Sequence, residues 1–416
     1  MKVFISYSAK ASVEKCFWQY FFQSCGIWTS IKQIENDLKV DLAQTPHLII
    51  LDSEDENKIL DVPKKNVVYC VKKSSKTKKR SDIIKIRWWS KEFYKDVITI
   101  LLADKKNRVA IHNLLEIFTG IENGKNGEWL KTEGLWGASW LFHEIGYGMM
   151  EEWSEEIQDK CNKSIKKLKR KEREIGDCWN YKYMKLYCEY LKCGVSNKDF
   201  FSRLGECKKI LEECEELSKK EGWLPTLCVL SGQICNLSVA ESRYAVNYYD
   251  IAVKYEQQAD LLYEIGRIYE KIYSDNEAAL YNYYRSYMCD KNYYRALYKL
   301  AIDLEQKDKW IDAMGFYNKI QDILKEIKCK DSITIKEIEY KYKTYSKMIN
   351  LCQKNISDDD VVNSFEKEIN EIREHIEDYV DFGKMFNIMF EPQNCKIKMK
   401  DLMNILRQKM KNECIN

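Results

Sequence analysis

A ladder of small and aromatic residues is the feature that most constrains the fold of this chain. Ala245, Ala279 and Ala313 are spaced 34 residues apart. Each is followed four residues later by a tyrosine, Tyr249, Tyr283 and Tyr317. A period of this length is typical of helical hairpins that stack on one another. A small residue lies where two helices touch, and an aromatic residue one turn on fills the groove beside it. The sequence therefore predicts an array of helical repeats.

The helices between these rungs carry small residues of their own. Gly266 and Ala301 lie 35 residues apart, and Ser231 lies a further 35 residues upstream. The one-residue difference from 34 predicts one longer connecting loop. The segment resembles tetratricopeptide repeats, whose signature has small residues at the helix crossings and aromatic residues between them. The resemblance implies a protein or peptide partner that binds through the repeat array.

Composition limits the classes of partner and the compartment that we expect for this chain. The chain has 416 residues, 45% of them hydrophobic, with 68 Lys and Arg against 65 Asp and Glu. This length predicts two or three domains, and the balanced charge gives no overall reason to expect nucleic acid or a membrane as partner. The 16 cysteines are spread thinly among apolar neighbours, as is typical of buried thiols in a reducing compartment. No apolar run approaches the roughly 18 residues of a membrane span. We therefore expect a soluble, cytoplasmic protein.

The first 105 residues alternate between short apolar runs and amphipathic stretches. Such alternation predicts a small parallel sheet covered on both faces by helices. The predicted strands begin with Val3–Ser8 and continue with Leu48–Leu51, Asn66–Val71 and Ile83–Trp88. The predicted helices are a segment from Val13 to Ser24, capped by Ser12 and closed by Gly26, then a segment from Ile31 to Leu42, and Lys91–Leu102.

The opening run, Val3-Phe4-Ile5-Ser6-Tyr7-Ser8, resembles the first strand of Toll/interleukin-1 receptor (TIR) domains. The resemblance covers about a quarter of the chain and implies a flavodoxin-like topology. Many prokaryotic members of that family cleave the glycosidic bond of NAD with a glutamate on the helix after the third strand. Only a short stretch separates Leu51 from Asn66 here, too little for that helix. The family's Asp and Pro-Gly of the second motif are also absent between Gly26 and Ile34.

Cleavage of a ribosidic bond requires a carboxylate near the developing oxocarbenium ion. Glu54 and Glu56 are the nearby candidates, and the alternative interpretation is a solvated acidic turn that leaves a strand. Ser6, Tyr7 and Ser8 follow the carboxyl end of a strand, where open parallel sheets bind ligands. They are the candidates for contact with NAD or a related nucleotide. A serine hydrogen-bonded to its own turn explains Ser6 equally well.

Residues 106 to 180 form a helical bridge with a Gly/Trp-rich segment and a basic helix. Trp136, Trp140, His143 and Tyr147 share one helical stripe. The stripe either lines a purine pocket or forms an aromatic seam that joins the N-terminal domain to the helices. His143-Glu144 starts like a zinc-protease motif, but Tyr147 occupies the place of the second histidine, so we predict no metal site.

Two lysine-rich segments, Lys72–Arg80 and Lys163–Arg173, read either as anion-binding surfaces or as solvated faces. The predicted divisions are a TIR-like α/β domain at 1–105, the bridge at 106–180, tetratricopeptide-like repeats at 181–325 and capping helices at 326–416. The fold class expected is thus an α/β domain followed by an all-α repeat array.

Two functions fit these features. The first is a TIR-like signalling protein whose repeats recognise a protein or peptide, in prokaryotic antiviral defence or stress signalling, with self-association through the TIR-like domain. The second is a divergent NAD hydrolase that is activated through the repeats. The missing helix after the third strand favours the first.

Overall fold

The structure is a computed structural model. It describes residues 2–7, 12–33, 47–51, 67–71, 97–99, 101, 105–120, 134–145, 151–175, 178–196, 200–222, 224–238, 241–325, 335–355 and 359–374. The chain divides into two compact units, one of residues 1–238 with 383–395 and one of residues 239–382 with 396–416. This division does not coincide with the expected bounds at 105, 180 and 325. Those bounds delimit folding domains, which compactness alone does not test, and they stay predictions.

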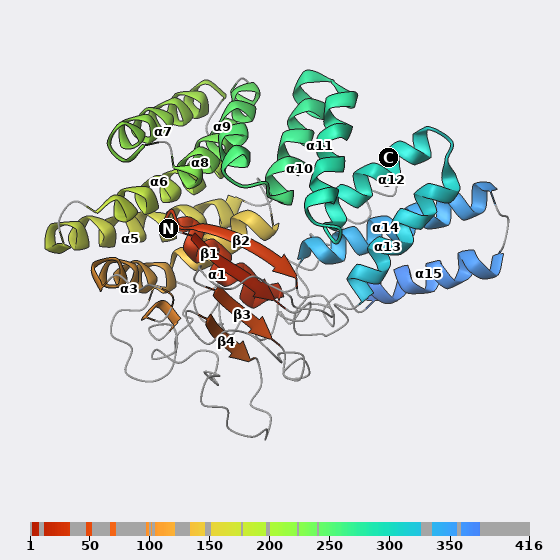
Figure 1. Ribbon diagram of the computed structural model, residues 1–416, viewed down its shortest axis with the longest axis horizontal. Helices are drawn as coiled ribbons and strands as arrows, with labels where there is room; N and C mark the ends of the chain where they lie inside the picture. The colour runs from red at the N-terminus through yellow and green to blue at the C-terminus, as the bar shows by residue number, and fades with distance from the viewer. Residues whose placement is uncertain are drawn as a thin grey trace. The chain divides into compact units, whose positions relative to one another are not determined.

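The first unit begins with a parallel sheet, as predicted (Figure 1). Its described strands are β1 (Lys2–Tyr7), β2 (Trp28–Gln33), β3 (His47–Leu51) and β4 (Val67–Val71). Their order is β2-β1-β3-β4. Tyr7 pairs with Gln33 on one side and with Ile50 on the other, so β1 lies at the point where the strand order reverses.

Strand β2 corrects one prediction. The apolar spacing from Ile31 to Leu42 predicted a helix, but Ile31 pairs with Ile5 inside the sheet. The prediction was wrong at its start because Thr29 and Ser30, although polar, are buried in the strand. A period of three between Ile31 and Ile34 is a weak signal over so few residues. Residues 34–46 and the predicted strand Ile83–Trp88 lie outside the described residues.

The helix α1 (Ser12–Ser24) is covered on two sides. It packs against β1 and β2 and also against α4 and α6. The buried apolar positions are Cys16, Phe17, Trp18, Tyr20, Phe21 and Phe22, which together cover more than half of the helix circumference. A helix that is apolar nearly all round belongs in the core of a larger body. The sheet and the following helices therefore share one core in the first unit.

The other helices of the first unit lie along the chain as follows: α3 (Lys105–Thr119), α4 (Leu135–Trp140) with the π-helical turn Leu141–Ile145, α5 (Glu151–Ile175), α6 (Trp179–Gly194), α7 (Phe200–Glu221) and α8 (Pro225–Cys235). Val97, Ile98 and Leu101 are also helical and buried, within the predicted helix Lys91–Leu102. In α5 the side chains of Ile165 and Leu168 are buried, while Lys163, Lys166 and Lys169 are exposed. The basic segment is thus a helix with a narrow apolar edge.

The second unit is a run of antiparallel helices. They are α9 (Ser242–Tyr255), α10 (Ala259–Ile268) with the π-helical turn η4 (Tyr269–Tyr273), α11 (Asn276–Cys289), α12 (Tyr294–Gln306), α13 (Trp310–Lys325), α14 (Ile335–Asn355) and α15 (Asp359–Glu374). Each helix packs on the next, most extensively α10 on α11 and α12 on α13. After residue 180 the described residues contain helices and no strand. The expectation of an α/β part followed by helices is confirmed for the described residues.

The predicted ladder lies in the core of these helices. Ala245, Ala279 and Ala313 are at most 2% exposed, and so are Tyr249, Tyr283 and Tyr317. Gly266 packs against the ring of Tyr283 and the carbonyl of Ala279. The small residues therefore stand at helix contacts, as the spacing predicted.

The spacing of 35 between Gly266 and Ala301 has two structural counterparts. The predicted longer loop is present, since four residues join α11 to α12 whereas three join α9 to α10. Ala279 lies 13 positions after Gly266, whereas Ala313 lies 12 positions after Ala301. The loop after η4 has two residues, Ser274 and Asp275, whereas the loop after α12 has three. The insertion is therefore inside the helix, in the turn η4, since a π-helical turn holds one additional residue. The loop after η4 is thus the shorter of these two, and the longer loop that the spacing predicted is the one between α11 and α12.

Candidate functional site

The predicted nucleotide site lies only partly within the described residues. Ser6 is buried and Tyr7 is half-buried at the carboxyl end of β1, and the Lys15 ammonium lies 5.3 Å from the centre of the Tyr7 ring. Ser8, Glu54 and Glu56 lie outside the described residues. The structure thus places two of the five candidates at the sheet edge.

The aromatic stripe of the bridge forms a packing seam. The ring of Trp136 meets Phe17 edge-on at 5.0 Å, and the His143 ring stacks on Tyr20 at 4.8 Å. His143 Nε2 and the Tyr187 hydroxyl share a hydrogen bond of 3.0 Å, and Tyr187 donates to Ser139. The seam joins α1 to the helices after it, and Tyr147 lies outside the described residues. Among the described residues no group of three or more His, Cys, Asp or Glu side chains could hold a metal ion.

Polar contacts repeat along the second unit beside the ladder. The Tyr283 hydroxyl donates to Glu270, which also binds the Lys299 ammonium at 2.8 Å. In the next repeat the Tyr317 hydroxyl donates to Glu305 at 3.0 Å, and Lys347 binds Glu305 at 3.3 Å. The two glutamates are 35 residues apart and the two tyrosines 34. Each set therefore joins three successive helical segments by one carboxylate.

The environment of Glu270 shifts its titration. Burial alone would raise the pKa of Glu270, but the hydrogen bonds from Lys299 and Tyr283 outweigh it, so the pKa lies below its usual value. Burial and the bond to Glu270 raise the pKa of Tyr283. The tyrosine therefore stays a neutral donor and the glutamate stays an anion at neutral pH.

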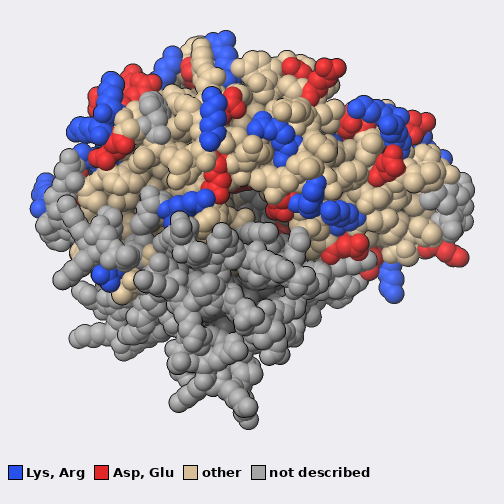
Figure 2. Space-filling model, viewed as in Figure 1, with Lys and Arg blue, Asp and Glu red and all other residues tan. Residues whose placement is uncertain are grey.

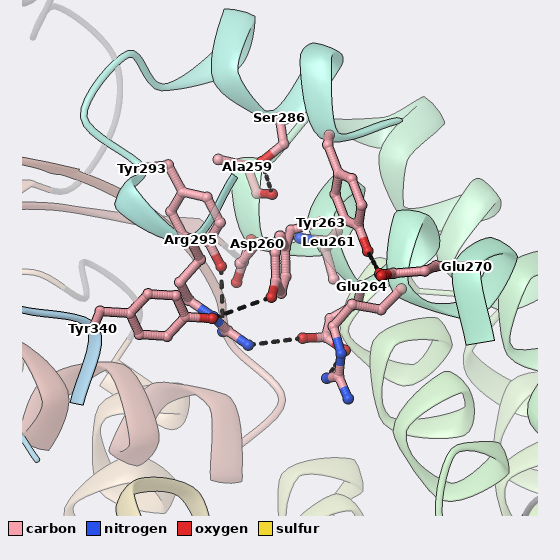
Figure 3. Close-up of polar contacts among 12 residues, drawn as sticks. Ala259, Asp260, Leu261, Tyr263, Glu264, Glu270, Ser286, Tyr293, Arg295 and Tyr340 are labelled. Atoms are coloured by element: carbon pink, nitrogen blue, oxygen red, sulfur yellow. Dashed lines mark hydrogen bonds and ion pairs between the residues drawn. The ribbon is translucent and has the colours of Figure 1, made fainter. Parts of the chain in front are cut away.

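A second cluster centres on Arg295 of α12 (Figure 3). Its Nη2 atom lies 3.4 Å from Glu264 Oε1, and the other oxygen of Glu264 binds Arg267 at 2.7 Å. The Arg295 guanidinium also lies over the Tyr263 ring, 4.4 Å from its centre. The Tyr263 and Tyr340 hydroxyls are 3.3 Å apart. The cluster links α10, α12 and α14 from inside the unit.

Arg295 also sets the charge balance of this cluster. Burial opposes ionisation of Tyr340, but the Arg295 guanidinium and hydrogen bonds hold the pKa of Tyr340 below its ordinary value. Burial raises the pKa of the neighbouring Asp260. A half-buried arginine with partners on α10 and α14 helps to fix the spacing of these helices from α12.

The exposed aromatic side chains lie on the opposite side of the ladder helices. On α11, Tyr281, Tyr284 and Met288 are exposed by 62%, 51% and 52% at helical spacing. On α9, Ile251 and Tyr255 are exposed by 41% and 58%, about one turn apart. Both helices pack against α10 and η4. We call these five residues the aromatic face.

Cations and carboxylates are mixed around the aromatic face. Arg285 lies 5.5 Å from the centre of the Tyr281 ring, while Lys254 and Asp250 share α9. Figure 2 likewise shows blue and red side chains interspersed over the tan surface on the side it presents. A surface of this kind suits a partner that offers apolar and hydrogen-bonding groups rather than one strong charge.

Sequence reasoning found the buried ladder and missed the groups around it. The recurrence of Glu270 at Glu305 was a usable signal, since both follow the small residue of their helix by four positions. The pairing of these glutamates with Lys299 and Lys347 had no such signal, because the lysines are 48 residues apart.

Comparisons with known proteins add no family to this description. A scan against models of protein families and a search of curated proteins each find no match for the chain. Within the described residues, no helix combines the length and the apolar character that crossing a membrane requires.

Proposed function

We propose that this chain is a TIR-like signalling protein in which the helical repeats bind a protein or peptide partner. The observation that carries the proposal is the aromatic face. Five large apolar side chains stand exposed on α9 and α11, which both pack against α10 and whose opposite faces carry the buried ladder. Tyrosine and methionine are enriched in protein interfaces, and side chains on a rigid helix lose little entropy on binding.

The sheet supports the TIR-like part of the proposal. Its strand order, β2-β1-β3-β4, agrees with the first four strands of the flavodoxin-like order. In such a protein the repeats recognise the partner and the N-terminal domain passes the event on through self-association. The setting we propose, prokaryotic antiviral defence or stress signalling, rests on the resemblance of the opening strand alone.

A covalent trap at the aromatic face tests partner binding. Tyr284 is replaced by a photoreactive phenylalanine analogue in the full chain, and the protein is irradiated in the cells that make it. We expect one discrete adduct with a second protein. The matched control carries the same analogue at Lys219, an exposed position of α7. Equal adducts at both positions, or none at Tyr284, would contradict the proposal.

The alternative function is NAD cleavage, and the place of Ser6 and Tyr7 favours it. They lie at the carboxyl end of β1, beside the reversal of strand order between β1 and β3, where open α/β sheets bind ligands. The test is NAD loss under crowding, with wild-type chain and with Glu54→Gln and Glu56→Gln combined. Robust turnover that the double change abolishes would replace the signalling proposal by the hydrolase.

A further inference from the structure

Two cysteine thiols meet between α6 and α7 of the first unit. The Sγ atoms of Cys193 and Cys207 are 3.4 Å apart. Cys207 is fully buried and Cys193 is 3% exposed. Neither is in a disulfide, and the same holds for the other described cysteines. Fourteen positions separate the pair in the sequence, so the contact depends on how the two helices fold back on each other.

The chain around the pair holds the two sulfur atoms in place. Cys193 lies in the last turn of α6, and Cys207 lies in the second turn of α7. Arg203 donates to the Ser196 carbonyl at 2.5 Å, which ties the start of α7 to the end of α6. Gly194 has no room for a side chain, because a Cβ atom there would come within 2.4 Å of the Phe142 ring. The two thiols are therefore fixed as neighbours by packing on several sides.

We infer that Cys193 and Cys207 are an oxidisable pair that closes to a disulfide when the protein meets hydrogen peroxide. A disulfide needs its sulfur atoms about 2.05 Å apart, so the two must approach by roughly 1.4 Å, which rotation about the Cα–Cβ bonds supplies.

The chemistry balances with one peroxide molecule for each pair. The sulfur of Cys193 attacks one peroxide oxygen, the O–O bond breaks, and a sulfenic acid and one water form. The sulfur of Cys207 then attacks the sulfenic sulfur, the S–O bond breaks, and the second water leaves as the S–S bond forms. The thiols lose two electrons in total, peroxide gains them, and both thiol protons end in water.

The surroundings of Cys193 also affect how fast the pair is oxidised. The Cys207 thiol beside it and burial both raise the pKa of Cys193. Because the thiolate is the reactive form, the pair should oxidise more slowly than an exposed cysteine. Cys289 of α11 is exposed and serves as the internal reference for that comparison.

The closed pair would join α6 to α7 covalently. A disulfide that closes a loop of this length restricts the unfolded chain. We expect the oxidised first unit to melt roughly 6–12 °C above the reduced one. Peroxide would thereby stiffen the helices that follow the bridge without changing their packing.

The experiment uses the full chain. It is reduced, freed of reductant, treated with millimolar peroxide for increasing times, blocked with N-ethylmaleimide and digested with trypsin. Cleavage after Lys192, Lys198, Arg203 and Lys208 releases Cys193 and Cys207 on separate peptides. We expect a cross-linked peptide that is lighter by two hydrogens than the sum of its parts, and that reductant removes.

Three variants decide the result. Cys207→Ser and Cys207→Ala should both abolish the cross-link and the rise in melting temperature, whereas Cys289→Ser should leave both intact. Circular dichroism of each variant checks that it is folded. If Cys193 and Cys207 both remain reduced when peroxide treatment is continued far beyond the time that oxidises Cys289, or if Cys193 pairs with another cysteine, the inference is wrong.

Discussion

Gly266 lies so close to the ring of Tyr283 that a Cβ atom on Gly266 would come within 2.6 Å of Cε1. A methyl group there must push apart α10 and α11, because the Ala279 carbonyl blocks the other side at 3.1 Å. We predict that Gly266→Ala lowers the free energy of unfolding by about 1–3 kcal/mol. Urea unfolding measures the change.

A second glycine supplies the matched control. Gly315 lies inside α13 with no atom near the place where a Cβ would stand. Because alanine favours helix over glycine, Gly315→Ala should raise the free energy of unfolding by about 0.5–1 kcal/mol. The same substitution thus has opposite signs at the two positions. Equal effects would show that Gly266 is not at a helix contact.

The buried alanines of the ladder should not tolerate a larger side chain. Ala279 is 2% exposed between α10 and α11, so Ala279→Leu should cost about 1–3 kcal/mol by overpacking. Asn318→Leu introduces a leucine at an exposed position of α13 and should change stability by less than about 0.5 kcal/mol. Thermal melting of both variants compares them. An unchanged melting temperature for Ala279→Leu would refute the register of the ladder.

Acid should weaken the contact made by Glu270. Its pKa in the folded chain is lowered, so the stability it contributes is present above the unfolded value of about 4.3 and is lost as pH falls through the lower folded value. Glu270→Gln should therefore reduce the free energy of unfolding at pH 7, and the difference from wild type should shrink below about pH 4. Glu277→Gln, at an exposed position of α11, is the control.

Asp260 should behave in the opposite way. Burial raises its pKa in the folded chain, so the charged carboxylate opposes folding at neutral pH, and that cost disappears as the pH falls to the unfolded value of about 3.9. Asp260→Asn should thus stabilise the protein at pH 7 and have little effect at pH 3. Denaturant unfolding at both pH values measures the sign of the change in the free energy of unfolding. A variant less stable at pH 7 would show that the bond from Asp260 to the Leu261 amide outweighs burial.

Proteolysis tests the aromatic seam. The Gly124-Lys125-Asn126-Gly127 segment has the composition of an accessible turn, so mild trypsin should cut there. Because Phe17 packs on Trp136 and Asn180 donates to the Cys25 carbonyl at 2.7 Å, the two fragments should elute together in gel filtration and separate in urea. Fragments that separate in native buffer would argue for an N-terminal domain independent of the bridge.

The sequence predicted those parts of the structure that one local period determines. Ala279 and Tyr283 were placed correctly because a buried helix contact must recur with the repeat. Strand β2 was missed because Thr29 and Ser30 are polar in sequence and buried only through pairing with β1. The lysine partners of Glu270 and Glu305 depend on which helices become neighbours, and the contact of Cys193 with Cys207 depends on the fold of one hairpin. Neither leaves a periodic trace.

The π-helical turn η4 also affects how the repeats must be aligned with one another. Glu270 and Glu305 are 35 positions apart, yet the tyrosines that donate to them are 34 apart. A search that imposes one fixed period therefore slips by a residue in the middle of a helix, where alignments do not normally allow a gap. Repeats of this kind are better recognised from the recurrence of paired contacts, a glutamate with its tyrosine, than from a constant count of residues.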